Sequence, residues 1–188
     1  MNRTLLLLLL LYGNASLASE QWVTQFVSGV LDISTKQQVQ ALSETYDCGE
    51  TEGVEYCSFD QVYRGIQLDV VIYVEPDDLV SKITYIFPFN VHNYTHVQTS
   101  LRKDSYHLIK ASVGGESVTV EELLNQGTAQ TADKKLIEFL NLYPISTSKL
   151  FTWVRKNEIQ NTLATETLLM TSDTESIQLI WNRESNAN

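Results

Sequence analysis

Apolar residues recur at alternate positions through the middle and the end of the chain, as they do in half-buried β-strands. Between residues 66 and 74, for example, Leu68, Val70 and Ile72 occupy every second position. Short connections join the first three predicted strands, so we expect an antiparallel meander, and a polar turn at 172–175 predicts a hairpin near the end. The predicted strands span residues 54–63, 66–74, 79–87, 106–113, 149–155, 165–171 and 176–182.

Apolar residues spaced three or four apart predict helices before and between these strands. The first helix runs from residue 19 to about residue 33, and Gly29 on its apolar arc indicates a close approach by another element. Thr35 and Gln38 have the spacing of a capping box, which opens a second helix with Tyr46 on its apolar face. Further helices are predicted at 90–103, 121–125 and 133–143.

This order of elements predicts an α+β fold, with a mostly antiparallel sheet of about six or seven strands and helices packed on one face. Regular βαβ alternation is missing, which argues against a doubly wound parallel sheet. No internal repeat, low-complexity linker or shift in composition marks a domain boundary. We therefore expect a single α+β domain over residues 19–188.

The first 18 residues have the three parts of a secretory signal peptide. Arg3 supplies the positive start, Leu5–Leu11 is an unbroken apolar run, and the small residues Ser16 and Ala18 precede the expected cleavage site. The apolar run is far shorter than the roughly 20 residues needed to cross a bilayer. We therefore expect a secreted or periplasmic protein that keeps no stable membrane span once residues 1–18 are removed.

The charge balance narrows the choice of partner. The 188-residue chain carries 23 acidic against 13 basic residues, a formal net charge of −10. Because nucleic-acid binding depends on clustered Lys and Arg, this balance argues against a nucleic-acid partner. An acidic surface would instead favour a basic protein as partner and speed its encounter.

The only two cysteines in the chain are Cys48 and Cys57. In an exported protein the oxidising surroundings favour a disulfide between them. A zinc site is disfavoured, because the spacing is too wide for a short Cys pair and no histidine lies near them in sequence. We expect a disulfide that closes an acidic loop.

The strongest candidate for chemistry is a set of three histidines. His92 and His96 are four residues apart on the helix predicted at 90–103, so they share one helix face and could bind a divalent metal ion with His107 as a third ligand. Asn93 replaces the glutamate of the zincin pattern, and both histidines are expected to point away from the apolar stripe. The alternative interpretation is a pair of solvated surface histidines, with Asn93 as a glycosylation sequon in an exported chain.

The acidic loop offers a second candidate, a Ca²⁺ site. Its third and fifth positions counted from the first aspartate hold Gly and Thr, which breaks the EF-hand register. We therefore interpret the stretch as a solvated acidic loop. Its acidic residues are Asp47, Glu50, Glu52 and Glu55.

The sequence contains no G-x-S-x-G elbow, no phosphate-binding glycine motif, and no combination of S-x-x-K with S-D-N and K-T-G. We therefore expect an exported, non-catalytic module that binds another protein and needs no cofactor. One alternative is a secreted hydrolase, assisted by a metal at His92, His96 and His107. Another is a small-molecule carrier, which would require a sizeable apolar cavity.

Overall fold

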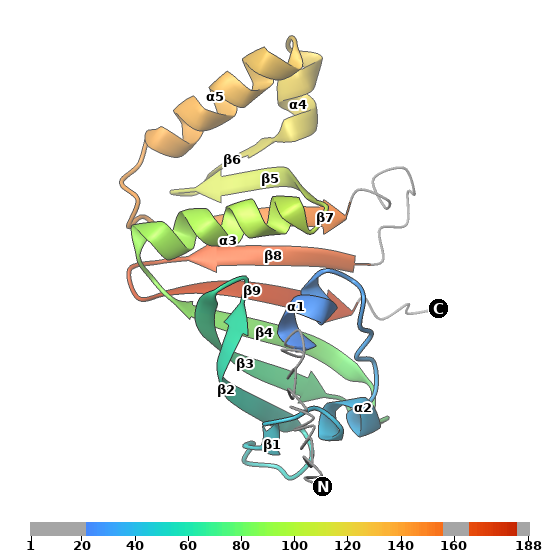
Figure 1. The fold of residues 1–188 in the computed structure, drawn as a ribbon. Coiled ribbons are helices and arrows are strands. Elements are labelled where there is room, and N and C mark those ends of the chain that lie inside the picture. Colours follow the sequence, from blue (N-terminus) through green and yellow to red (C-terminus); the bar gives the residue numbers. More distant parts are fainter. Residues whose placement is uncertain (1–21, 156–165, 184–188) are drawn as a thin grey trace, which may run out of the picture.

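The computed structural model describes residues 22–155 and 166–183, in which nine antiparallel strands form one sheet and the helices α1 and α3 pack on one of its faces (Figure 1). The predicted α+β fold is confirmed, with nine strands in place of six or seven. The predicted signal peptide, residues 1–18, lies outside the described residues. The strands are β1 (Tyr46–Asp47), β2 (Glu55–Tyr63), β3 (Ile66–Val74), β4 (Val80–Pro88), β5 (Tyr106–Val113), β6 (Glu116–Thr119), β7 (Lys149–Arg155), β8 (Glu166–Ser172) and β9 (Ser176–Arg183). The helices are α1 (Trp22–Val27), α2 (Lys36–Gln40), α3 (Val91–Lys103), α4 (Val120–Asn125) and α5 (Ala129–Asn141).

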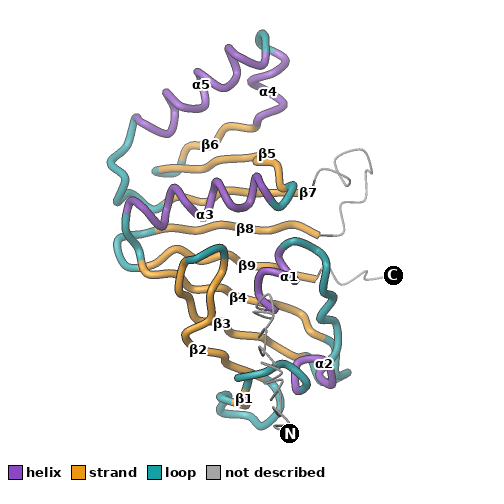
Figure 2. The backbone as a smooth tube through the Cα atoms, in the orientation of Figure 1, coloured by secondary structure: helices purple, strands orange, loops and turns teal. Residues whose placement is uncertain are grey.

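Two three-stranded meanders make up most of the sheet, whose order is β1-β2-β3-β4-β9-β8-β7-β5-β6. Strands β2 to β4 form the first meander and β7 to β9 the second, and they join where β4 pairs with β9. Helix α3 carries the chain across the sheet from β4 to β5 (Figure 2). The last strand, β9, therefore lies in the centre of the sheet beside β4, while β1–β2 and β5–β6 form its opposite edges.

The core consists of rows of side chains that run across the sheet. In one row Val70, Tyr85, Leu179, Met170 and Phe151 are neighbours on five successive strands, and all five are fully buried. Val70 is one of the alternate apolar positions predicted at 66–74, and it faces the core because successive side chains of a strand point to opposite faces. The helix-covered face thus holds the core.

The first helix ends earlier than predicted, at Val27 rather than near residue 33. Gly29 adopts a φ of 78°, which is a left-handed conformation that favours glycine. The predicted close approach at Gly29 comes from Arg155, whose guanidinium donates to the carbonyl oxygens of Phe26 and Val27 and would overlap a Cβ at Gly29. The helical prediction beyond Val27 was therefore wrong because this turn breaks it.

Other elements also begin or end at residues that differ from those predicted. The Thr35–Gln38 capping box is present, but α2 ends at Gln40 and Tyr46 lies in β1. Helix α5 begins at Ala129, four residues before the predicted start, because the side chain of Thr128 caps it. Strands β1 and β6, which the sequence does not predict, lie at the sheet edges, where β1 pairs with β2 and β6 pairs with β5.

A buried carboxylate ties α3 to the first meander. The side chain of Asp104, at the C-terminal end of α3, is only 1% exposed. The Tyr63 hydroxyl donates to Asp104 over 2.7 Å, and the Arg64 guanidinium forms an ion pair with the same carboxylate. The turn between β2 and β3 is thereby fixed against the start of β5.

Candidate protein-interaction site

The β1–β2 edge of the sheet is a disulfide-closed hairpin. Cys48 follows β1, Cys57 lies in β2, and a disulfide joins them with their Cα atoms 5.8 Å apart. The predicted pairing of the cysteines is thus confirmed. Tyr46 pairs with Cys57 across the two strands, and the backbone N–H of Cys48 donates to the carbonyl of Glu55. The short strand β1 is therefore held in place by backbone pairing and by a covalent bond.

Two aromatic side chains stand half exposed at this edge. Tyr46 is 47% exposed and Phe59 is 49% exposed. Their ring centroids are 5.7 Å apart in an edge-to-face arrangement, which is a favourable geometry for an aromatic pair. The pair adjoins the disulfide, because Tyr46 is the partner of Cys57 in the sheet register.

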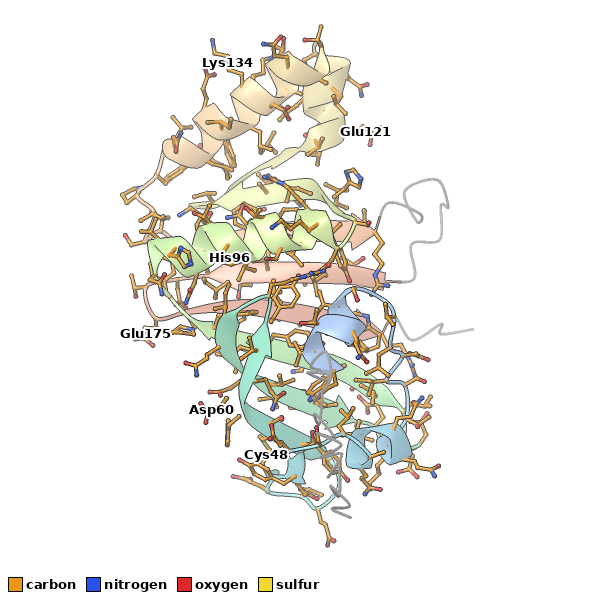
Figure 3. All side chains as sticks on the ribbon, viewed as in Figure 1. Cys48, Asp60, His96, Glu121, Lys134 and Glu175 are labelled. Atoms are coloured by element: carbon orange, nitrogen blue, oxygen red, sulfur yellow. A yellow bond between two sulfur atoms is a disulfide. The ribbon has the colours of Figure 1, made fainter. Side chains whose placement is uncertain are left out.

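Acidic residues lie close in sequence to the aromatic pair, on β1, on β2 and in the adjoining loops. None of them forms an ion pair with another described residue. The bases within residues 22–88 make other contacts: Lys36 pairs with Asp78, Arg64 pairs with Asp104, and Lys82 lies over the Tyr73 ring. The acidic residues are Glu44, Asp47, Glu50, Glu52, Glu55 and Asp60. Figure 3 shows Cys48 and Asp60 together at this end of the molecule. We call Tyr46, Phe59 and these six acidic residues the acidic aromatic patch.

Hydrogen bonds hold the backbone beneath the patch. The Ser58 hydroxyl donates to the carbonyl of Glu44 over 2.8 Å, and the Gln61 side-chain amide donates to the Glu44 carboxylate over 3.0 Å. Asp47 accepts hydrogen bonds from the backbone N–H groups of Gly49 and Gly53. These bonds fix the loop before β1 and the loop after it, so the aromatic pair is presented on a braced surface.

The negative charge of this edge affects a neighbouring tyrosine. Tyr73 is the register partner of Glu55. Burial raises the pKa of Tyr73 above its ordinary value, and the Glu55 carboxylate raises it further. The Lys82 ammonium lies 3.7 Å from the centre of the Tyr73 ring, on the side of the sheet away from the core row.

The patch could be found only in part from the sequence. The acidic loop and the disulfide were predicted, but Tyr46 was assigned to the apolar face of a helix and was therefore expected to be buried. Phe59 falls in a predicted strand, but the register of β2 shifts between Ser58 and Gln61, and Asp60 has a φ of 54°. This bulge changes the phase of the strand, and it cannot be read from the alternation of apolar residues.

The acidic loop does not gather its carboxylates around one point. In the described part of the chain, the single group of three metal-ligating side chains with ligand atoms within 4.8 Å of one another is Cys48, Glu55 and Cys57. Both cysteines of that group are in the disulfide. Among the described residues, no three carboxylates of this loop come within that distance of one another.

The three histidines are divided between two places. His92 and His96 lie on α3 with ring centroids 5.4 Å apart and line one shallow groove, whereas His107 lies on β5 and lines a different groove. Asn93, between the first two, is buried, and its side-chain nitrogen donates to the carbonyl of Pro88 over 3.0 Å. A glycan on that nitrogen would require this contact to open.

No protein-family model matches the chain, and no curated protein or solved structure is significantly similar to it. Within the described ranges, no helix is long and apolar enough to cross a membrane. Inference about function therefore depends on the geometry of the described residues.

Proposed function

We propose that the protein is an exported, non-catalytic binding module that recognises a basic protein through the acidic aromatic patch. One observation carries the proposal: Tyr46 and Phe59, each about half exposed, pack ring against ring on a braced sheet edge among acidic residues without ion-pair partners. Export is supported by the Cys48–Cys57 disulfide and by the leader-like first 18 residues.

The aromatic pair supplies the apolar centre that a protein interface needs. Tyrosine and phenylalanine are enriched at the centres of interfaces, where a few such residues contribute most of the binding free energy. Both rings are already positioned by the hairpin, so little conformational entropy is lost when a partner covers them. The surrounding acidic residues would form the polar rim.

The negative charge around the patch favours a basic protein as partner. Among the described residues, 22–88 carry three bases against eleven acids, whereas 89–155 carry seven bases against six acids. The acidity is thus concentrated in the half of the molecule that holds the patch. A partner with exposed Lys or Arg would be drawn to this half, and the attraction would weaken as salt is added.

The test is affinity capture from the extracytoplasmic fraction of the source with tagged protein and four single variants. Phe59→Ser and Tyr46→Ser remove the rings, while Val30→Ser and Val91→Ser remove exposed apolar side chains outside the patch. We expect a basic partner whose affinity falls roughly 30-fold in each ring variant, as for a hot-spot residue. The two valine variants should bind as the unmodified protein does.

A partner retained equally by all four variants would show that binding occurs elsewhere, and a partner that is acidic would overturn the charge argument. The metal-assisted hydrolase is tested on the same eluate by measuring metal content. About one metal ion per chain, lost on replacing His92 and His96 together with Ala, would favour that alternative over the binding module.

A further inference from the structure

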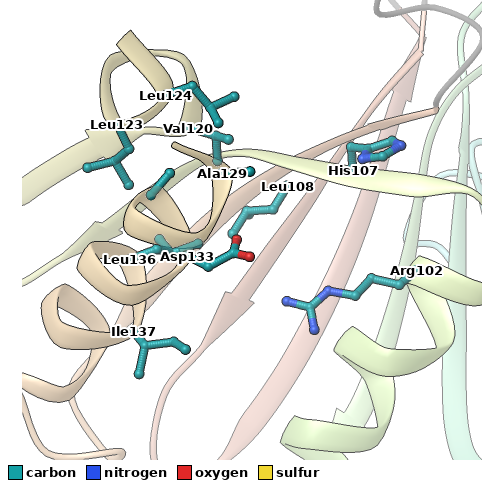
Figure 4. Close-up of a pocket in the computed structure, with 11 residues that line it drawn as sticks. Arg102, His107, Leu108, Val120, Leu123, Leu124, Ala129, Asp133, Leu136 and Ile137 are labelled. Atoms are coloured by element: carbon teal, nitrogen blue, oxygen red, sulfur yellow. The ribbon is translucent and has the colours of Figure 1, made fainter. Parts of the chain in front are cut away.

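A groove of about 480 Å³ lies at the opposite end of the sheet, between the last turn of α3, strand β5 and the α4–α5 pair (Figure 4). This volume is within the roughly 300–1,000 Å³ range of small-molecule sites. Most of the residues that line it are apolar and come from β5, α4 and α5, while about half of its exposed surface is polar. The larger apolar residues are Leu108, Val120, Leu123, Leu124, Leu136 and Ile137.

Two opposite charges face this groove from its two helical walls. Arg102 extends from α3 and Asp133 from α5, and both point toward the space between the helices (Figure 4). Neither forms an ion pair with any described residue, and they do not pair with each other. The Arg102 guanidinium lies 5.9 Å from the centre of the Trp153 ring.

We infer that this groove is a binding site for a short zwitterionic peptide with apolar side chains. The peptide carboxylate would pair with Arg102, because a guanidinium binds a carboxylate in a bidentate geometry, through two parallel N–H···O hydrogen bonds. The terminal ammonium would pair with Asp133 on the other wall. The apolar side chains would cover Leu108, Leu136 and Ile137, which line the groove and are not fully buried.

The two charges together exclude simpler ligands. A fatty acid would satisfy Arg102 but would bring a second carboxylate into the groove with Asp133, and an apolar amine would meet the reverse conflict at Arg102. A ligand with a carboxylate at one end, an ammonium at the other and an apolar body between them matches Arg102, Asp133 and the apolar lining residues. The site is separate from the acidic aromatic patch, since β5 and β2 lie near opposite edges of the sheet.

The test is calorimetric titration of the purified exported protein with four probes: leucyl-leucine, N-acetyl-leucyl-leucine, leucyl-leucinamide and octanoate. We expect saturable binding of leucyl-leucine, and binding at least about tenfold weaker for each of the three probes that lack one charge. Phe59→Ser should leave these values unchanged, so failure here and failure of the proposed protein-binding function are distinguishable.

Variants assign each charge to its residue. Arg102→Gln should bind leucyl-leucine and leucyl-leucinamide equally, and Asp133→Asn should bind leucyl-leucine and its N-acetyl form equally. Lys103→Gln and Glu138→Gln, exposed neighbours on the same helices that do not line the groove, should bind as the unmodified protein does. Thermal melts of all four variants should match, because the replaced side chains are exposed.

The inference would be overturned by the absence of saturable leucyl-leucine binding. It would also be overturned if octanoate or the N-acetyl peptide bound as tightly as leucyl-leucine, since the ammonium would then have no role. Unchanged discrimination among the probes in Arg102→Gln and Asp133→Asn would place the ligand outside this groove.

Discussion

At the scale of single residues, the best-defined polar contact in the molecule is the one around Asp104. Its carboxylate is buried and is satisfied by the Tyr63 hydroxyl and the Arg64 guanidinium. Burial raises the pKa of Tyr63 well above its ordinary value, and the hydrogen bond to Asp104 raises it further. Tyr63 is therefore protonated and able to donate to Asp104 at neutral pH.

Replacing Tyr63 with Phe should lower the free energy of unfolding by about 1.5–3 kcal/mol, because a buried charged group loses one hydrogen-bond donor. Urea denaturation measures the change. Tyr56→Phe is the matched control: its hydroxyl accepts a hydrogen bond from the uncharged Gln40 amide, so its loss should stay within about 1 kcal/mol. Equal effects in the two variants would mean that the Tyr63–Asp104 hydrogen bond stabilises the fold no more than the Gln40–Tyr56 hydrogen bond does.

The β8–β9 turn offers a prediction on pH. Asp173 accepts from the backbone N–H groups of Ser176 and Glu175, and these bonds hold the pKa of the Asp173 carboxyl below its ordinary value of 3.8. A lowered pKa in the folded state adds stability above the unfolded-state value, and this stability is lost as pH falls through the folded-state value.

Asp173→Asn should accordingly melt at a lower temperature than the unmodified protein at neutral pH, and the difference should shrink as the pH falls below about 3.8. Thermal melts across this range measure it. Glu175→Gln, in the same turn, provides the comparison. A difference that stays constant with pH would show that the Asp173 charge does not strengthen the turn.

At the scale of elements, β1 depends on few interactions. It has two residues, pairs only with β2 among the described strands, and has both of its residues exposed. A two-residue strand with no buried side chain contributes little hydrophobic stabilisation. The disulfide is therefore the interaction that we expect to keep Tyr46 next to Phe59.

Replacing Cys48 and Cys57 together with Ser should lower the free energy of unfolding by about 2–3 kcal/mol, the value for a closed loop of about ten residues. Adding reductant to the unmodified protein should lower stability to the same level, and it should leave the double variant unchanged. Unfolding at the same urea concentration with and without the disulfide would contradict this role.

Long strands with one buried face could be predicted from the sequence, and the edges could not. The alternation at 66–74 and 176–182 marks strands whose inward side chains are now seen in the core, including Trp181 against Phe26. Strand β6 carries no such signal, because its burial comes from pairing at an edge. The α1 helix ends early at the left-handed turn of Gly29, where Arg155, far away in sequence, binds the last carbonyls of the helix.

The candidate sites follow the same division. The disulfide could be predicted because two cysteines allow a single pairing. The aromatic pair could not, since it depends on a bulge in β2 and on a strand too short to leave a pattern. The groove could not be predicted either, because residues of α3, β5, α4 and α5 line it and only tertiary packing brings these segments together.

At the scale of the whole molecule, the charge and the exposed chemistry are divided between the two edges of one sheet. The β1–β2 edge is acidic and aromatic, whereas the groove beside β5 is lined mostly by apolar residues and has one charged side chain of each sign. We infer that the acidic edge meets a basic protein and that the groove meets a small ligand. The two functions can be tested separately because the sites share no residue.

The central claim is that the acidic aromatic patch is the surface that contacts a protein partner. The most direct measurement is photo-crosslinking in the native compartment with benzoylphenylalanine in place of Phe59, compared with the same replacement at Val91. The account predicts a single basic protein joined to position 59 and none to position 91. No adduct at position 59, or the same adducts from both positions, would contradict it.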